Sequence, residues 1–193
     1  MSLKRCWETS DPLYQVYHDE EWGRPVTDER GLYERLCLEG FQSGLSWLTI
    51  LRKRDGFRAA FEGFDPDTVA AFGARDVERL LQDASIVRHR GKIEAAIANA
   101  RATVAMRGDV PLHELFWSFA PDEHAAPHTT ADWHSSTPES RALAKELRRR
   151  GFRFVGPTTA YAAMQACGVV NDHLEGCWVR GAVESERTVA LAT

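Results

Sequence analysis

Two pairs of metal-binding residue types lie at opposite ends of this 193-residue chain. Cys6 and His18 stand near its start, and His173 and Cys177 near its end. The i, i+4 spacing of the second pair would place both side chains on one face of a helical turn. Two thiolates and two imidazoles form a closed tetrahedral set, which suits structural zinc and leaves no open position for catalysis. The alternative is two buried cysteines and two ordinary polar histidines, because neither pair is a CxxC knuckle.

A carboxylate occurs where a core residue is expected. In the segment that begins at Asp28, the inward stripe runs through Leu32, Leu36, Glu39 and Ser43. Burying a carboxylate costs on the order of several kcal/mol unless it is paired or hydrogen-bonded. Glu39 is therefore a candidate functional residue, with a structural ion pair as the alternative.

Aromatic residues accompany this carboxylate. Trp7, Tyr14 and Tyr17 come from the N-terminal segment, and Trp47 follows Glu39 after a bend. A carboxylate among aromatic rings suits a flat, cationic heterocycle, which can stack on the rings and donate hydrogen bonds to the carboxylate. The alternative is that these rings are ordinary core residues.

A basic helix over 138–150 is followed by a short connector and a second helix. This arrangement resembles the helix-hairpin-helix DNA-binding element, in which backbone N–H groups and a helix dipole meet phosphates. Gly156 would permit close backbone approach, Thr158 lies at the start of the second helix, and Arg153 adds a positive charge to the connector. An ordinary corner between two helices is the alternative.

The composition is that of a globular protein, with 44% hydrophobic and 27% charged residues. The formal net charge of −4 argues mildly against nucleic acid, but basic patches over 88–92 and 145–153 could act locally. Either patch could also be a solvated helix face.

No apolar run approaches a membrane span, and no secretory signal opens the chain, so we expect no membrane partner and a cytoplasmic location. Four cysteines then favour reduced thiols or a metal, with Cys37 and Cys167 as free buried thiols.

Helix signals run through nearly the whole chain, and no stretch shows sustained alternation, so we predict an all-α fold. Residues 120–136 are predicted to form a long surface loop. Residues 1–180 are expected to form a single compact domain, in which two helical lobes are possible, and residues 181–193 a flexible tail. The predicted helices begin after Asp11 and Asp28 and then cover 46–53, 56–62, 66–72, 75–82, 91–106, 111–118, 138–150 and 157–168.

Several motifs occur in order along the chain. They are Cys6-Trp7, Asp11-Pro12-Leu13-Tyr14, Tyr17-His18-Asp19, Glu21-Trp22-Gly23, Leu38-Glu39-Gly40, Gly44-Leu45-Ser46-Trp47, Arg88-His89-Arg90-Gly91-Lys92-Ile93, Gly151-Phe152, Phe154-Val155-Gly156, Met164-Gln165-Ala166-Cys167-Gly168 and Asn171-Asp172-His173. Together they resemble the 3-methyladenine DNA glycosylase I (Tag) family of the helix-hairpin-helix glycosylase superfamily. The resemblance covers essentially residues 4–178.

The resemblance implies a monofunctional DNA repair enzyme that flips out 3-methyladenine, removes it hydrolytically from duplex DNA and leaves an abasic site. It also implies one structural Zn²⁺ per chain, held by Cys6, His18, His173 and Cys177. The expected partner is double-stranded DNA that contains alkylated purines, bound by a monomer.

The resemblance further assigns the base pocket. Glu39 and Tyr17 would be its hydrogen-bonding groups, with Glu39 also the candidate catalytic residue. Trp47 and Tyr14 would be its stacking walls, and Trp7 and Trp22 match by motif.

Many relatives in the superfamily carry a catalytic Asp in a Val-Asp-Thr-His setting. Here Asn171 takes that position when the segment is aligned on His173, and Asp172 is the fallback if the register differs by one residue. An Asn cannot supply a full negative charge to an oxocarbenium-like transition state. We therefore expect weak chemical assistance, sufficient only for an activated leaving group.

Three other functions remain open at the sequence level. A DNA-binding module without catalysis would not explain a Glu and several aromatics gathered away from the hairpin. A related glycosylase could act on 3-methylguanine or on a broader range of alkylpurines. A zinc hydrolase is disfavoured, because four protein ligands leave no position for an activated water.

Overall fold

The computed structural model describes residues 4–192, and within that range the chain is helical with no β-strand. The α-helices are α1 (Pro12–Glu20), α2 (Glu29–Gln42), α3 (Trp47–Ala60), α4 (Pro66–Ala70), α5 (Ala74–Gln82), α6 (Arg90–Met106), α7 (Leu112–Trp117), α8 (Pro138–Arg149), α9 (Pro157–Ala166) and α10 (Arg180–Leu191). Two short 3-10 helices are η1 (Glu62–Phe64) and η2 (Thr130–Asp132). The predicted all-α class is confirmed.

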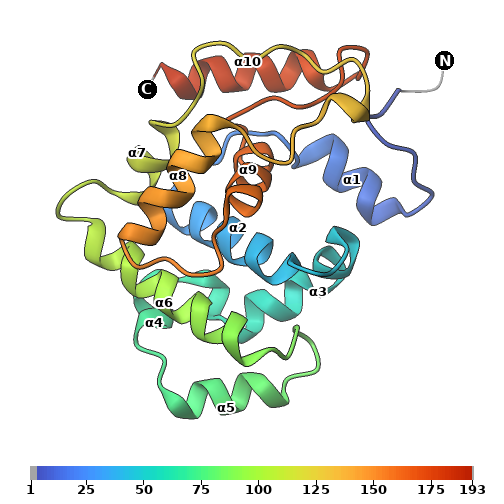
Figure 1. Cartoon of the computed structure of the whole chain (residues 1–193). Helices are drawn as coiled ribbons and strands as arrows, with labels where there is room; N and C mark the ends of the chain where they lie inside the picture. Colours follow the sequence, from blue (N-terminus) through green and yellow to red (C-terminus); the bar gives the residue numbers. More distant parts are fainter. Residues whose placement is uncertain (1–3, 193) are drawn as a thin grey trace.

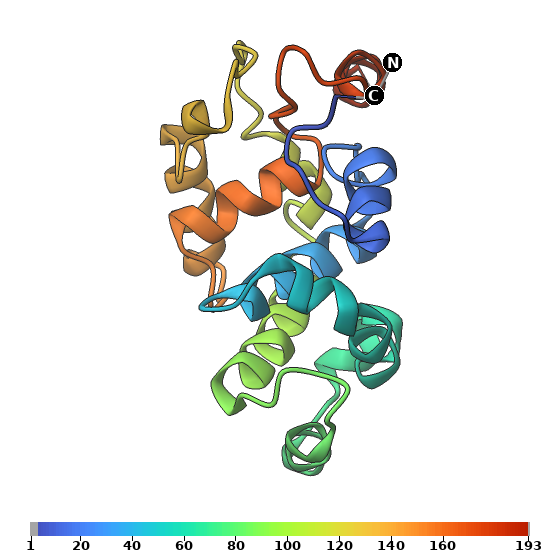
Figure 2. The same cartoon turned by 90° about the vertical axis from the view of Figure 1, so that its right-hand side faces the viewer.

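Helix α2 lies at the centre of the molecule and packs against α3, α6, α7 and α9. Figure 1 shows α3 to α6 below α2, with α1, α8, α9 and α10 above it. Figure 2 gives the same two groups from the side, and the N-terminal segment runs down beside the C-terminal one. The backbone N–H of Trp178 donates to the carbonyl of Lys4 (3.1 Å) and ties these two segments together. Elements from both ends of the chain can therefore meet in one site.

The helix starts follow local capping chemistry. Asp11 Oδ1 accepts hydrogen bonds from the backbone N–H groups of Leu13 and Tyr14, and Pro12 occupies the first helical position. Asp28 caps α2 in the same way through Gly31 N–H. These two caps fix where α1 and α2 begin.

Two expectations about the helices are wrong. The separate segments 46–53 and 56–62 are one helix, α3, which continues through Gly56. A Cβ at Gly56 would come within 2.7 Å of Ser85, so this glycine permits close packing and does not end the helix.

The expectation of a flexible tail after Arg180 is also wrong, because those residues form α10. Val183 and Arg187 on one face of α10 are buried, and Arg187 Nε donates to the carbonyl of Val169 (3.0 Å). The aliphatic part of the Arg187 side chain covers apolar surface here. A search of the sequence for apolar residues at helical spacing does not detect a buried helix face of this kind. The predicted domain and tail also include residues 1–3 and 193, which lie outside the described residues.

Candidate functional site

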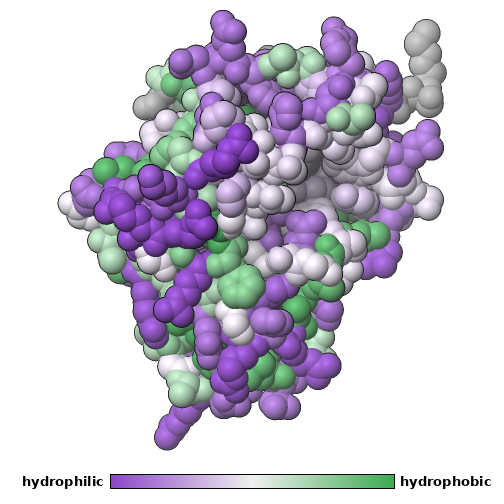
Figure 3. All heavy atoms as spheres, viewed as in Figure 1, coloured by the Kyte–Doolittle hydropathy of each residue, from purple (hydrophilic) through white to green (hydrophobic). Residues whose placement is uncertain are grey.

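A cavity of about 330 Å³ opens where α1, α2, α3 and α9 converge. Figure 3 shows a hollow in this part of the surface, among pale residues of intermediate hydropathy. All six residues that the resemblance linked to the base pocket line this cavity, Trp7 and Trp22 included. The full lining is Trp7, Tyr14, Tyr17, Trp22, Glu39, Gln42, Trp47, Trp133, Ala162 and Gln165.

Glu39 is the carboxylate of this cavity. Glu39 is only 6% exposed, which confirms that it lies on the buried face of α2 together with Leu32 and Leu36. Within residues 4–192, no group donates a hydrogen bond to its carboxylate, so the predicted alternative of a structural ion pair does not apply. Burial raises the pKa of Glu39 to about 8, against the opposing effect of the Arg35 guanidinium. A buried carboxylate without a protein partner is poised to receive a donor from a ligand.

Aromatic rings form the walls around Glu39. The Tyr17 and Trp47 rings lie 5.3 Å apart between centroids and are tilted by 44°. Trp7 and Tyr14 form a second pair, with centroids 5.1 Å apart. Tyr17 is fully buried, and burial raises the pKa of its phenol, so the hydroxyl stays protonated and can donate. These rings and the Glu39 carboxylate line one cavity.

Two indole N–H groups in the same cavity are also unpartnered. The Nε1 atoms of Trp7 and Trp47 are buried, and neither has a hydrogen-bond acceptor among the described residues. Buried donors are normally satisfied, so their presence next to Glu39 indicates a site built for an occupant with polar edges. The walls thus offer hydrogen bonding as well as stacking.

Four lining residues were not predicted as site residues: Trp133, Gln42, Ala162 and Gln165. Trp133 comes from the 120–136 segment, to which the sequence analysis assigned no site, and its ring centroid lies 5.7 Å from that of Trp22. Gln42 and Gln165 also line the cavity. Trp133 lies in irregular chain next to η2, where no periodicity marks its direction, so a tryptophan in a polar loop was the only available signal.

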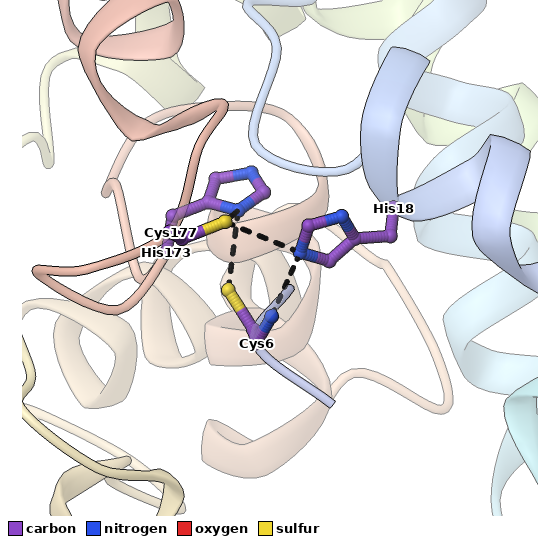
Figure 4. Close-up of side chains that lie close together, drawn as sticks. All are labelled: Cys6, His18, His173 and Cys177. Carbon is purple, nitrogen blue, oxygen red and sulfur yellow. Dashed lines mark hydrogen bonds between the residues drawn. The ribbon is translucent and has the colours of Figure 1, made fainter. Parts of the chain in front are cut away.

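The four predicted metal ligands come together in a buried cluster. Figure 4 shows Cys6 on the N-terminal segment and His18 on α1 facing His173 and Cys177 on the C-terminal segment. Their ligand atoms all lie within 4.8 Å of one another. Cys6 Sγ lies 3.3 Å from His173 Nδ1, and Cys177 Sγ lies 3.5 Å from both His18 Nε2 and His173 Nδ1. A zinc tetrahedron with ligand distances of about 2.0–2.3 Å has edges of roughly 3.3–3.8 Å, so the donor set fits zinc.

Hydrogen bonds to groups outside the cluster orient both imidazole rings. His18 Nδ1 donates to Asp19 (2.7 Å), which is itself paired with Arg5, and His173 Nε2 donates to the carbonyl of Trp22 (2.8 Å). Each ring therefore turns its other nitrogen into the cluster, as metal-bound histidines do. Gly23 has φ +81°, and a Cβ there would lie 3.1 Å from the His173 ring, so glycine allows this close approach.

The two thiols of the cluster have opposite pKa shifts. The hydrogen bond from the Cys6 thiol lowers the pKa of Cys177, whereas donation of that bond and burial raise the pKa of Cys6. Cys37 and Cys167 are buried outside the cluster, and burial raises the pKa of each to about 12, as expected for inert thiols.

The predicted DNA-binding residues lie in the turn that joins α8 to α9 and at the start of α9. Gly156 is the residue before α9, and a Cβ at this position would meet nothing within 4 Å. The backbone N–H of Thr158 has no acceptor among the described residues, so it faces outward at the start of α9. Arg153 is exposed, and Gly151 supplies the turn with φ +99°. Because α9 also carries Ala162 and Gln165, one helix connects this turn to the cavity.

The basic patches are partly neutralised. Arg149 and Arg150 both pair with Glu146, and Arg90 pairs with Glu78. Ion pairs within the protein therefore reduce the positive charge that the sequence suggested. Arg153 has no carboxylate partner within residues 4–192 and keeps its charge free.

Asn171 and Asp172 are the two candidates for the position of the catalytic aspartate, and neither residue lines the cavity. Asn171 is buried, and its amide donates to the carbonyl of Arg180 and to Glu184 (2.8 Å). Asp172 accepts hydrogen bonds from Tyr161, Gln165 and His124. Burial alone would raise the pKa of Asp172, but these bonds outweigh it and lower the pKa. Glu39 is thus the carboxylate that faces the cavity.

No helix among the described residues is long and apolar enough to cross a membrane.

Comparison with known proteins places the chain in a family. A family model described as methyladenine glycosylase matches residues 7–180. The chain is 52% identical to DNA-3-methyladenine glycosylase 1 of Escherichia coli (strain K12), covering 91% of this chain and 96% of that protein. It superimposes on a crystal structure of 3-methyladenine DNA glycosylase I with a TM-score of 0.87 at 52% identity, over 91% of this chain and 98% of the other.

A second solved relative was crystallised in complex with 3-methyladenine. That Tyr-to-Phe variant of 3-methyladenine DNA glycosylase I is 33% identical to this chain, with a TM-score of 0.85 over 89% of this chain and 94% of the other. Matches of this extent, in sequence and in fold, place the chain in the methyladenine glycosylase family.

Proposed function

We propose that this protein is a base-excision repair enzyme that removes 3-methyladenine from alkylated DNA. The observation that carries the proposal is the cavity in which Glu39, buried and without a protein partner, stands among aromatic walls. The family and its relatives named for 3-methyladenine support the same substrate.

The cavity suits the chemistry of this lesion. A purine methylated at N3 is cationic in the nucleotide, so its glycosidic bond is weakened and the base leaves as a neutral molecule. The Tyr17 and Trp47 rings can stack on the flat base, and Glu39 can accept hydrogen bonds from it. Charge and shape together would discriminate against an ordinary neutral adenine.

The reaction is a hydrolysis at a flipped-out nucleotide. Extrusion from the duplex costs a few kcal/mol, approximately, and brings the base into the cavity. The electron pair of the bond between the sugar C1′ and the base stays with the base. Water then adds its hydroxyl at C1′ and releases a proton, which leaves an abasic site without strand cleavage. Because Asn171 and Asp172 are engaged elsewhere, the main contribution of the protein is to bind the activated base.

Structural zinc is the cofactor that the Cys6–His18–His173–Cys177 cluster would hold. The supporting observations are the complete set of two thiols and two oriented imidazoles, all buried. When bound, the ion would supply a cross-link between the two ends of the chain and no open coordination position. The same cluster places Trp7 and Trp22 beside His18, because both ring centroids lie within 6.3 Å of that imidazole.

The turn between α8 and α9 is the proposed helix-hairpin-helix contact with duplex DNA. Its open position at Gly156, the outward N–H of Thr158 and the exposed charge of Arg153 suit phosphates and carry no sequence readout. A monomer in the cytoplasm is the form in which we expect the protein to act.

Chromatography of the bases released from methylated duplex DNA tests the function. Free 3-methyladenine in excess over other methylated bases, with alkali-labile sites left behind, is the expected result. A protein that binds this DNA but releases no base would be a binding module, and release of mainly another alkylpurine would reassign the substrate.

A further inference from the structure

Lys92 is a buried lysine on α6 whose ammonium group binds the end of α2. Its Nζ donates to the carbonyl of Phe41 at 2.9 Å and to the carbonyl of Ser43 at 2.6 Å. Lys92 is buried, and no carboxylate pairs with it within residues 4–192. Residues 88–93, the motif that contains this lysine, do not line the base cavity, so direct contact with a base does not account for it.

The last carbonyls of α2 need donors from outside that helix. The final turn of an α-helix leaves its carbonyls without intrahelical partners, and a cation there also interacts favourably with the helix dipole. Helix α2 has no basic residue in its own last turn. Lys92 supplies the charge from α6, where the side chain of His89 accepts from the backbone N–H of Lys92 (3.2 Å) and caps the start of the helix. A lysine that is fixed on one helix thus stabilises the end of another.

The segment that Lys92 holds connects two walls of the base cavity. Residues 43–46 join α2 to α3 and lie between Gln42 and Trp47, which both line the cavity. All four residues of this connection are exposed, and a Cβ at Gly44 (φ +82°) would meet nothing within 4 Å. In the described part of the chain, Lys92 is the only residue beyond α2 and α3 that hydrogen-bonds to the connection. Packing therefore does little to fix this segment, and its position depends on Lys92.

The position of the connection decides how Glu39 and Trp47 face each other. Glu39 lies in the last turn but one of α2, and Trp47 is the first residue of α3. No described residue hydrogen-bonds to the Glu39 carboxylate or to the Trp47 indole N–H. Their relative placement therefore depends on the backbones of α2 and α3. A displacement of about 1 Å, caused by a change far from the reacting atoms, can slow a reaction by up to roughly 100-fold.

We propose that Lys92 is a positioning residue for base excision, which holds the connection between α2 and α3 and so fixes the Trp47 ring relative to the Glu39 carboxylate. It touches neither the base nor the reacting bond. A base stacked on Trp47 presents its edge to Glu39 only when the two groups keep the right separation, so the excision rate depends on Lys92. The proposal rests on the function proposed above and extends it to a residue outside the cavity.

Single-turnover excision of 3-methyladenine from methylated duplex DNA, at saturating protein, tests this role. Lys92→Met keeps the apolar part of the side chain and removes the donors, and it should lower the maximal rate by about tenfold to a hundredfold. Lys92→Arg can still donate to both carbonyls and should keep most of the parent rate. Lys53→Met is the matched control, since Lys53 Nζ also donates to a backbone carbonyl, that of Ala84, and neither residue lines the cavity. It should excise at the parent rate.

Two further comparisons separate positioning from stability. Rates are measured well below the unfolding temperature of every variant, where a lysine that only stabilised the fold would leave the maximal rate unchanged. Lys92→Met is also placed in a Trp47→Ala background. If Lys92 acts through Trp47, its loss should slow excision there by about twofold at most. If Lys92→Met does not fold, Lys92→Gln takes its place in both comparisons.

The outcomes separate this role from the proposed function. Slower excision that Lys92→Arg restores, and that is absent from the Trp47→Ala background, supports the proposal. A parent-like maximal rate in the Lys92 variant, or an equal slowing in both backgrounds, overturns it while the function stands. A parent protein that releases no 3-methyladenine overturns the function and the role of Lys92 with it.

Discussion

Asn99 on α6 holds the backbone of Arg153 from two directions. Its amide oxygen accepts from Arg153 N–H at 2.7 Å, and its amide nitrogen donates to Arg153 C=O at 3.2 Å. Asn99 is buried, and one residue thus satisfies both backbone groups of a residue in the turn between α8 and α9. The proposed DNA-binding turn is therefore positioned from the group of helices below α2.

Asn99→Ala is expected to weaken binding to duplex DNA, because the turn loses its anchor and two backbone groups lose their partners. The cost to the free energy of unfolding should be about 1–3 kcal/mol. Fluorescence anisotropy with an undamaged duplex measures the first effect and urea denaturation the second. Thr103→Val, one turn further along α6, is the control, and equal DNA affinity in both variants would argue against the anchor.

Gly156→Leu should weaken DNA binding on unrelated sequences by similar factors, since a side chain would stand where a phosphate approaches. A Cβ at Gly156 meets nothing within 4 Å, so the fold should tolerate the change. Gly181→Leu on α10, an equally open position, is the matched control. Affinities measured at several salt concentrations should fall steeply with salt for the parent protein. Undiminished affinity of the Gly156 variant for DNA with an abasic-site analogue would exclude this turn as the contact.

Elemental analysis is expected to find one zinc per chain in the parent. Cys177→Ser should lower zinc content and reduce thermal stability far more than a surface change does, because metal binding to such a site is coupled to folding. Cys37→Ala, which alters a buried thiol outside the cluster, should keep its zinc. Full zinc occupancy in Cys177→Ser or Cys6→Ser would remove the assignment.

Glu39 should give the stability of the free protein a pH dependence. Its pKa rises from an ordinary 4.5 to about 8 on folding, so folding favours the neutral acid. The contribution to stability is fully present below about pH 4.5 and is lost as pH rises through 8. Glu39→Gln does not ionise, so its stability relative to the parent should increase over this window by up to a few kcal/mol. Urea denaturation from pH 5 to pH 9 provides the comparison, and a constant difference would contradict a neutral Glu39.

Much of this site could be predicted because the signals are local. The Asp11 and Asp28 caps fix α1 and α2, and the three- and four-residue steps of α2 place Glu39 on the buried face. The ligand types of Cys6 and His173 indicated a cluster despite their distance in sequence. Residue type and periodicity were sufficient to place Glu39 on the buried face, whereas for the Cys/His cluster they left an alternative open that only the family resemblance narrowed.

The features that were missed depend on contacts between distant segments. Trp133 reaches the cavity because its indole donates to Asp172, and Gln165 is oriented by that same residue. Neither contact can be recognised from the periodicity of apolar residues in the sequence. Helix α10 was missed because its buried face uses an arginine, and the break expected between 53 and 56 failed because Gly56 permits packing against Ser85.

The central claim is that the cavity around Glu39 binds the damaged base, and single-turnover excision by Glu39→Gln tests it most directly. The substitution keeps the shape, removes the charge and replaces one acceptor oxygen with a donor. A charge-assisted hydrogen bond is worth about 1.5–3 kcal/mol, so release of 3-methyladenine should slow by roughly one to two orders of magnitude. Zinc content and binding to undamaged DNA should match the parent. If Glu39→Gln releases 3-methyladenine at the parent rate, the carboxylate has only a structural role and the base binds elsewhere.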